Sequence, residues 1–349
     1  MRRRAAAALV VPLSALMLGA SSCGVIPEDW RTPAFLKSDE EQLDERLPTA
    51  TGPVGEEPEV SFPDIDPPKE QISGVVHKGE GESELVRSDD MLLVDIVDYD
   101  WTGKGKTEKV QSTYETGAPM LLQLGQMTEE LTADLIDQPV GSRVVYVFPP
   151  SDPTTGQPSE EGTTSVSVLD IRGRYGKGDV VPGEQTTDGG GDLPTAADAG
   201  RAMPDITIPD ADPPKELETV ELVEGEGPEV ESGQQLVVQY TGVTWNDGEV
   251  FDSTWTRDGT PATFAIGVGQ VIQGWDEGLV GQKVGSRVML VIPEDLAYGE
   301  NAEASGSPAG TLVFVVDILG AVDTQPAPEP SDQPEASAEP EASASPDGE

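Results

Sequence analysis

Side chains that could act as nucleophiles, general bases or metal ligands are scarce in this chain of 349 residues. His77 is the only histidine and Cys23 the only cysteine, so a histidine-activated hydrolase and a cysteine-rich metal site both lack their residues. Asp252 with Asp276 or Glu277 could form a carboxylate pair, but acids near a helix N-terminus more often just favour its dipole. The composition therefore disfavours hydrolytic and metal-assisted catalysis.

The acidic residues favour a solvated surface over a site. The net charge is −44, which repels nucleic acid and anionic headgroups, and we interpret it as the soluble surface of an exported protein, with binding of a cationic partner as the alternative. Asp64-x-Asp66 and Asp210-x-Asp212 could hold calcium loosely, but no EF-hand spacing is present. We therefore predict no metal, no cofactor and no nucleic-acid partner.

The N-terminal sequence suggests a role for Cys23. Arginines at 2–4 precede an apolar stretch over 5–18, and small residues at 19–22 lead to the cysteine. The apolar stretch is shorter than the roughly 20 residues that span a bilayer. The segment resembles a lipoprotein signal peptide, although Ala20 stands where that motif prefers leucine, and a plain secretory signal is the alternative. We expect a lipidated Cys23 and an extracytoplasmic protein anchored to the cell membrane.

Two long segments repeat one another. The sequence at 63–70 recurs at 209–216, and the Val-Gly-Ser-Arg-Val of 140–144 recurs at 284–288. Pro, Gly and acidic residues dominate the intervening segments, a composition typical of disorder. The predicted order is a signal peptide over 1–22, the lipidated cysteine and a disordered stalk over 23–66, a first repeat over 67–175, a flexible linker over 176–205, a second repeat over 206–322 and a disordered acidic tail over 323–349.

The second repeat reads as strands around one helix. β-forming residues cluster at 236–240, 287–292 and 311–319, and Asn-Asp-Gly at 246–248 signals a turn before a strand. The spacing of apolar residues predicts a helix over 271–280, ended by Gly281. Several strands with one short helix predict an α+β domain with an antiparallel sheet.

Five motifs of this repeat then stand in a characteristic order. They are Tyr240-Thr241-Gly242, Gly248-x-Val250-Phe251-Asp252-Ser253, the run Gly-Gln-Val-Ile-Gln-Gly-Trp-Asp-Glu-Gly-Leu at 269–279, Leu296-Ala297-Tyr298-Gly299 and Thr311-Leu312-Val313-Phe314. In order and spacing, the second repeat resembles the FKBP-type peptidyl-prolyl isomerases over essentially its whole length. The first repeat is identified as a related, degenerate copy.

This resemblance implies a pocket and a reaction. Trp275 would form the floor and Tyr298 and Asp252 the polar groups, with Tyr240, Phe251, Val271, Ile272 and Phe314 as walls. In the family, the tyrosine hydroxyl and the backbone amide of the second residue of the Val-Ile pair bind ligand carbonyls. Rotation about an Xaa-Pro amide faces a barrier of about 18–20 kcal/mol from resonance, and an apolar cavity that prefers the twisted bond lowers it without a nucleophile.

Two departures from the family pattern concern the pocket. Ala262 replaces an aromatic residue, and the loop over 300–310 is small and acidic. We assign Phe264 to the core. We therefore expect a shallower pocket, modest turnover and weak binding of macrolide ligands.

The first repeat lacks the pocket residues. The equivalents of Tyr240, Asp252 and Trp275 are Ile96, Gln111 and Leu131, and the region of Tyr298 reads Thr-Thr at 154–155. Alternating strand residues at 91–97 and 166–171 predict that the fold persists. We expect a domain without catalytic activity.

The predicted function is isomerisation of Xaa-Pro bonds in exported proteins at the outer face of the membrane. Its partners would be proline-containing clients, and the membrane through the N-terminal lipid. The alternative is a tethered chaperone that holds clients in the same groove without accelerating isomerisation. A third interpretation is an envelope scaffold in which both folds are spacers.

Overall fold

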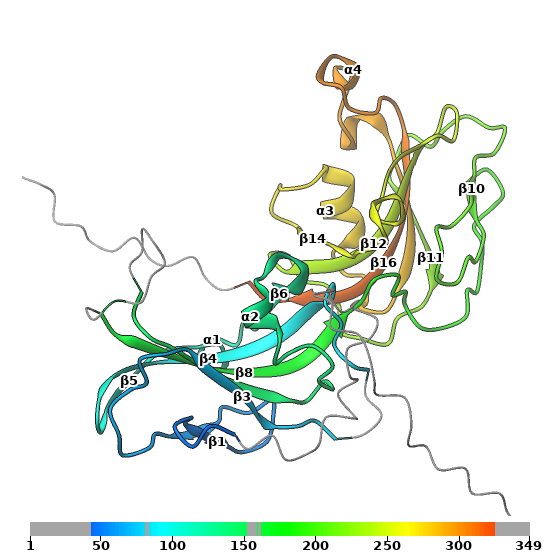
Figure 1. The fold of residues 1–349 in the computed structure, drawn as a ribbon. Helices are drawn as coiled ribbons and strands as arrows, with labels where there is room; N and C mark the ends of the chain where they lie inside the picture. The colour runs from blue at the N-terminus through cyan, green and yellow to red at the C-terminus, as the bar shows by residue number, and fades with distance from the viewer. Residues whose placement is uncertain (1–42, 81–83, 152–158, 160–161, 325–349) are drawn as a thin grey trace, which may run out of the picture. The chain divides into compact units, whose positions relative to one another are not determined.

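The computed structural model describes residues 43–80, 84–151, 159 and 162–324 (Figure 1). Two six-stranded sheets dominate it, and all of their strand pairs are antiparallel. The predicted α+β class with two FKBP-like domains is confirmed. The predicted signal peptide, the lipidation site Cys23 and the acidic tail from residue 325 onward lie outside the described residues.

The first domain, over residues 43–175, carries one of these sheets. Across the sheet the order is β3 (Ile72–His77), β7 (Arg143–Phe148), β8 (Thr164–Tyr175), β4 (Met91–Gly103) and β5 (Lys106–Ser112), and β6 (Met120–Gln123) also pairs with β4. Its helices are single turns, α1 (Thr113–Thr116), the 3₁₀ turn Leu124–Gln126 and α2 (Glu129–Thr132).

The second domain, over residues 176–324, repeats this arrangement. Its order is β11 (Glu218–Val223), β15 (Arg287–Ile292), β16 (Leu312–Val322), β12 (Gln235–Thr244) and β13 (Val250–Ser253), with β14 (Ala262–Ala265) paired to β12. Its helical elements are α3 (Gln273–Leu279), α4 (Ala302–Ser305) and the 3₁₀ turns Trp255–Arg257 and Glu294–Leu296. The predicted strands and helix of this repeat are confirmed to within a few residues.

The central strands of each sheet are apolar on both faces. In the second domain, Leu236 and Phe314 belong to the cluster that contains Trp275 of α3, whereas Val243 and Val313 belong to a separate buried cluster. Because side chains alternate along a strand, such a sheet has two faces that must be covered. Helix α3 covers only one of them.

A short hairpin ahead of each sheet covers the other face. The first strap (residues 47–62) holds β1 (Thr49–Thr51) and β2 (Glu59–Ser61), and the second strap (193–208) holds β9 (Thr195–Ala196) and β10 (Ile206–Thr207). Buried strap residues pack on the sheet face that carries Trp101 in the first domain and on the face that carries Trp245 in the second. In Figure 1, β10 and α3 lie on opposite sides of the second sheet.

The straps correct two predictions. Residues up to 66 were expected as a disordered stalk and 176–205 as a flexible linker, yet both contain paired strands and buried side chains such as Leu47 and Ala196. The repeat also begins earlier than predicted, since Leu-Pro-Thr-Ala at 47–50 recurs at 193–196. The pairing recurs as well, with Ala50 opposite Val60 and Ala196 opposite Ile206. High Pro, Gly and acid content concealed a few apolar residues that an open sheet face can bury.

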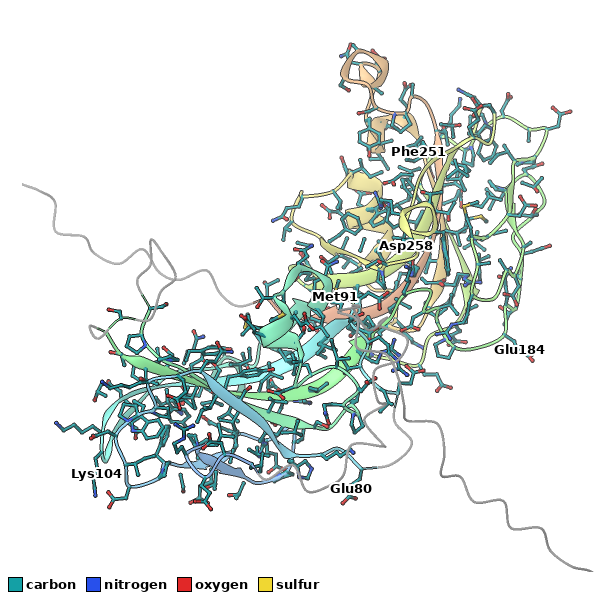
Figure 2. All side chains as sticks on the ribbon, viewed as in Figure 1. Glu80, Met91, Lys104, Glu184, Phe251 and Asp258 are labelled. Carbon is teal, nitrogen blue, oxygen red and sulfur yellow. The ribbon has the colours of Figure 1, made fainter. Side chains whose placement is uncertain are left out.

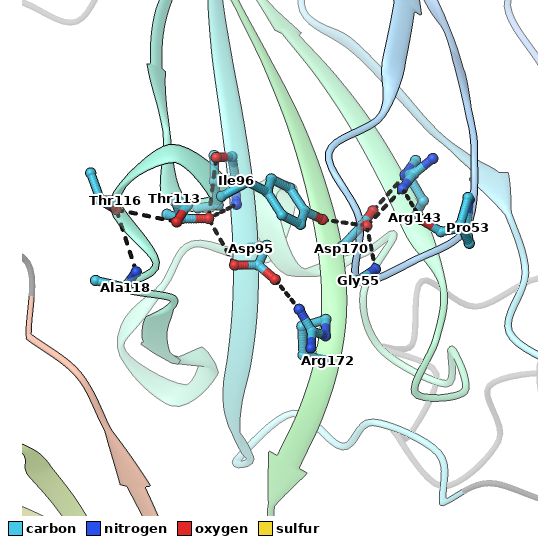
Figure 3. A network of polar contacts seen from close by, with 11 residues as sticks. Pro53, Gly55, Asp95, Ile96, Thr113, Thr116, Ala118, Arg143, Asp170 and Arg172 are labelled. Atoms are coloured by element: carbon cyan, nitrogen blue, oxygen red, sulfur yellow. Dashed lines mark hydrogen bonds and ion pairs between the residues drawn. The ribbon is translucent and has the colours of Figure 1, made fainter.

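A buried ion pair lies under each strap. Arg143 Nε and Nη2 donate to the Asp170 carboxylate at 2.5 and 2.7 Å, and Nη2 also donates to the carbonyl oxygen of Pro53 at 3.2 Å (Figure 3). Arg143 Nη1 donates to the carbonyl oxygen of Gly52 at 3.0 Å. In the second domain, Arg287 donates to Asp317 at 2.5 and 2.9 Å. The pair therefore stabilises the same strand register in both sheets.

Candidate active site

A cavity of about 590 Å³ opens on the α3 side of the second sheet. Strands β12, β13, β14 and β16, helix α3 and the segment after the 3₁₀ turn Glu294–Leu296 contribute to it. The side chains around it are included in Figure 2, where Phe251 is labelled. Its lining residues are Tyr240, Phe251, Asp252, Phe264, Gln270, Val271, Ile272, Gln273, Trp275, Ala297, Tyr298 and Phe314.

All eight residues predicted for the pocket lie in this lining. The predicted roles of these residues remain predictions, but the fold does bring together five separate motifs. Phe264 packs against the core cluster, as predicted, and it also lines the cavity. No residue from 300–310 is among the described residues that line the cavity.

Trp275 forms the floor of the cavity and is only 4% exposed. Its ring makes edge contacts with Tyr240, Phe264 and Phe314, with centroids 5.4, 5.1 and 5.3 Å away. Such edge-to-face pairs stabilise an aromatic cluster by about 0.5–1.5 kcal/mol each beyond burial. The floor is therefore held rigidly by the walls.

Two glycines explain how α3 can approach the sheet so closely. A Cβ on Gly274 would lie 2.3 Å from Cγ2 of Ile292, and one on Gly278 would lie 2.8 Å from Cδ2 of Leu290. Both distances are shorter than van der Waals contact, so a larger side chain would lift the helix. The glycines set the depth at which Trp275 enters the cavity.

Three polar side chains form a closed network at one wall. The Tyr240 hydroxyl donates to Asp252 Oδ2 at 2.5 Å, Arg257 Nη2 donates to the same hydroxyl at 2.7 Å, and Arg257 Nη1 lies 2.9 Å from Asp252 Oδ1. Burial and then the bond to Asp252 raise the pKa of Tyr240 to about 12, although Arg257 acts in the opposite direction. The polar groups of these three side chains are therefore already engaged in hydrogen bonds or an ion pair with one another.

Arg257 was not predicted from the sequence. It lies in the 3₁₀ turn Trp255–Arg257, and its guanidinium carbon is 5.7 Å from the centre of the Tyr240 ring. A signal was available, since Arg257 is the sole basic residue between Lys215 and Lys283. A lone cation five residues after Asp252 in so acidic a segment indicates a partner for that carboxylate.

Several hydrogen-bond donors at the cavity have no acceptor among the described residues, and the buried indole N–H of Trp275 is one of them. Two more are the Tyr298 hydroxyl and the backbone N–H of Ile272, the residue that precedes α3. The Tyr298 side chain is 45% exposed, and partial burial followed by the charge of Asp252 raises its pKa. Both groups can therefore donate to a carbonyl of a ligand.

The first domain differs at the equivalent positions. The strand registers place Ile96 opposite Leu169 as Tyr240 is opposite Val316, and Gln111 opposite Asp98 as Asp252 is opposite Gly242. The predicted substitutions at these two positions are therefore supported by register. The predicted Thr-Thr at 154–155 lies outside the described residues.

The two domains also differ in where an aromatic residue lies, because β7 of the first domain has one where β15 of the second has a leucine. Tyr146 of β7 takes the place of Leu290, and its hydroxyl donates at 2.7 Å to the carbonyl of Leu131, the predicted equivalent of Trp275. The Tyr146 ring is 4% exposed and packs in the core cluster of the first domain. At these positions the first domain therefore has core residues, whereas the second domain has residues that line a cavity.

The remaining candidates belong to the surface. His77 ends β3 and is exposed. Among the acidic motifs, Asp64 forms an ion pair with Lys104 Nζ at 2.9 Å, and Asp66 accepts from the Lys104 backbone N–H at 3.2 Å. No cluster of three or more potential metal-ligating side chains occurs within residues 43–324 as far as they are described.

Fold and cavity together define an antiparallel-sheet domain with a cavity over a tryptophan floor, and comparison with known proteins supports a family assignment. A family model described as FKBP-type peptidyl-prolyl cis-trans isomerase matches residues 227–319. An FK506-binding protein of Streptomyces anulatus is 45% identical over 118 residues, which are 33% of this chain and 94% of the relative. A probable FK506-binding protein of Corynebacterium glutamicum is 41% identical over 120 residues, 34% of this chain and 98% of the relative.

Among solved structures, the crystal structure of AtFKBP13 is 39% identical and covers 31% of this chain and 94% of its own, with a TM-score of 0.28. The relatives cover about a third of the chain, the part that contains the cavity. The chain belongs to the FKBP-type peptidyl-prolyl cis-trans isomerases, a family of enzymes.

Proposed function

We propose that the second domain isomerises Xaa-Pro bonds of exported proteins in the cavity over Trp275. The observation that carries this proposal is the combination of an aromatic floor and walls with two unengaged donors, the Tyr298 hydroxyl and the Ile272 N–H. A prolyl ring would lie on the indole, and the donors would bind the carbonyl groups on either side. The closed Tyr240–Asp252–Arg257 network would keep one wall fixed.

The reaction then needs no proton transfer. Twisting the Xaa-Pro amide breaks its resonance, which costs about 18–20 kcal/mol in water. The twisted bond is less polar at its carbonyl, so it loses less than the planar bond on entering an apolar cavity. Preferential binding of the twisted form lowers the barrier.

The test is the cis-trans exchange rate of a short Xaa-Pro peptide, measured by NMR with the full-length chain. We expect acceleration by the parent protein and a loss of at least about tenfold with Tyr298→Phe combined with Ile272→Pro, which removes both donors. Tyr146→Phe in the first domain is the matched control and should leave the rate unchanged, with folding of every variant checked by circular dichroism. Equal rates with and without the parent protein would refute the proposal.

A client-binding function without turnover is the second candidate. It is favoured by large exposed apolar residues next to the lining, Val250 at 42% and Val268 at 51%. A holding protein would suppress aggregation of proline-free clients and would keep doing so in the donor variant. Aggregation assays with such clients therefore separate the two functions.

We further propose that the protein is exported and held at the outer face of the cell membrane by lipid on Cys23. Support comes from the sequence preceding that cysteine and from the acidic surface. No helix among the described residues has the length and apolar character needed to cross a membrane. Metabolic labelling with a fatty acid should mark the parent chain and not Cys23→Ala, and equal labelling of both would exclude this anchor.

A further inference from the structure

The charges around the cavity suggest which Xaa-Pro segments enter it. The second domain, residues 176–324, contains 27 acidic residues and only six basic ones. Exposed carboxylates that neighbour the lining are Glu277, which accepts from the lining residue Gln273 at 2.6 Å, Asp295, two residues before Ala297, and Glu300, two residues after Tyr298. We call these three residues the mouth carboxylates.

The basic residues cannot balance this charge. Arg257 is the one at the cavity, and its ion pair with Asp252 and its bond to Tyr240 leave that site neutral overall. Arg287 is buried with Asp317, and Lys283 is paired with Glu224 at 3.3 Å. Lys177 is paired with Asp258 and Arg201 with Asp179. Lys215 precedes β11 and is remote in sequence from the lining. The mouth therefore has an uncompensated negative charge.

The chain also carries Xaa-Pro bonds that could compete for the cavity. Residues 325–349 contain six prolines, seven acidic residues and no basic one. A segment attached to the domain by a short tether has an effective concentration in the millimolar range, so a neutral tail of this kind would occupy the cavity for much of the time. Like charge at the mouth would disfavour binding of such an acidic segment.

We propose that the cavity selects Xaa-Pro segments flanked by Lys or Arg. This proposal rests on the proposed isomerase function and names its substrate class. The apolar walls receive the proline and its neighbour, while the mouth carboxylates attract cationic residues a few positions away. Because these carboxylates are exposed, their attraction is screened by salt.

Three blocked peptides test the proposal with the full-length chain. All contain Ala-Leu-Pro-Phe-Ala, flanked on both sides by Lys, Gln or Glu, so that the rotating bond and its uncatalysed barrier stay the same. We expect kcat/KM to fall from Lys to Gln to Glu, with about tenfold between the extremes at 20 mM salt and less than about threefold at 0.5 M, where the Debye length shrinks to about 4 Å.

Variants locate the source of the preference. Glu277→Gln, Asp295→Asn and Glu300→Gln together should bring the three peptides within about twofold. The matched control, Glu218→Gln, Glu226→Gln and Glu229→Gln, removes the same charge at exposed positions outside the lining and should keep the preference. Equal loss in both sets would assign the preference to the overall charge and overturn the proposal.

Other outcomes are equally decisive. Acceleration of all three peptides to the same extent would refute the selectivity and leave the isomerase function standing, whereas acceleration of none would refute the proposed function itself. A chain ending at Thr324 should keep the preference. If that truncation instead raised kcat/KM for every peptide, the tail would be the occupant of the cavity and the proposal would fall.

Discussion

The two domains of this chain keep one face of the sheet alike and differ on the other. Both retain a strap hairpin with equivalent pairing and a buried Arg–Asp pair beneath it. On the opposite face, the second domain has aromatic residues around a cavity, whereas the first has Ile96 and a buried Tyr146 in its core. The face under the strap is therefore common to both domains, and the other face is where their side chains differ.

One small feature close to the pocket is nevertheless shared. Thr254 Oγ1 accepts the Tyr240 backbone N–H at 3.0 Å, and Thr113 Oγ1 accepts the Ile96 N–H at 2.9 Å. These bonds hold the segment after the β13 or β5 strand against the central strand. The comparison thus separates backbone support, which is common to both domains, from cavity side chains, which are not.

The largest expected effect comes from breaking the shared ion pair. Arg143→Met leaves Asp170 buried without its partner and should lower the free energy of unfolding of the first domain by about 3–5 kcal/mol. Arg287→Met should cost the second domain somewhat less. The Arg143 side chain is 0% exposed and bonds two strap carbonyls, whereas that of Arg287 is 6% exposed and its strap contact is a longer ion pair, 3.6 Å from Asp198. Hydrogen exchange of the strand amides measures each domain separately.

Replacing both partners provides the control for this experiment. Arg143→Met with Asp170→Leu removes the uncompensated charge and should recover most of the loss. A loss below about 1 kcal/mol in both single variants would show that the pair does not support the fold, and the common face would need another explanation.

Shortening an apolar residue of a strap should have the next largest effect. Ile206 is 8% exposed and Leu47 is 6% exposed, and each packs on the sheet of its own domain. Ile206→Ala and Leu47→Ala should each lower the free energy of unfolding of their domain by about 2–4 kcal/mol. Val110→Ala, at a position that is 59% exposed, should change it by less than about 0.5 kcal/mol. Losses as small as that of the control would show that the straps do not stabilise their domains and act only as linkers.

The success of the sequence-based predictions also differs between the two faces of the sheet. The strands, α3 and the cavity lining could be predicted because the motifs around Phe251 and Trp275 are strong and stand in family order. The straps could not, because β9 and β10 are two residues each and their stability comes from the sheet beneath rather than from local propensity.

Two single residues were also predicted incompletely from the sequence, because their contacts form only in the folded domain. Phe264 was predicted as a core residue and packs against the core cluster, but its place in the cavity lining was missed, because an aromatic at a packing position has the same spacing in either case. Arg257 was missed because its partners, Asp252 and the Tyr240 hydroxyl, are brought to it only by the folded β12–β13 pair. Contacts of this kind depend on tertiary structure.

The pH dependence of stability should distinguish the two domains at Tyr240, whose equivalent in the first domain is not titratable. The folded pKa of about 12 lies above the ordinary tyrosine pKa of 10.0, so the neutral phenol is favoured by folding. This contribution is complete below pH 10 and is lost as the pH rises through 12, by up to about 2–3 kcal/mol at about 1.36 kcal/mol for each pKa unit. Urea unfolding of the parent chain and Tyr240→Phe should show a difference that shrinks over this range. A constant difference would contradict the assignment.

The smallest effect concerns Arg257, which we expect to be a positioning residue for Tyr240 and Asp252. Arg257→Met should lower kcat/KM by about threefold through a looser wall, with little change in stability because the Arg257 side chain is 55% exposed. It should also raise the pKa of Tyr240 further, since Arg257 lowers it in the parent protein. Ultraviolet titration of the parent, the variant and Arg257→Met with Tyr240→Phe isolates that phenol.

A matched ion pair in the first domain controls for the loss of an exposed arginine. Arg87 and Asp137 lie 2.7 Å apart with side-chain exposures of 58% and 30%, close to the 55% and 39% of Arg257 and Asp252. Arg87→Met should therefore reproduce any general effect of charge and should change neither kcat/KM nor the titration of Tyr240. If both variants lower kcat/KM equally, Arg257 acts only through the charge of the protein, and the second domain would owe its cavity to its aromatic residues alone.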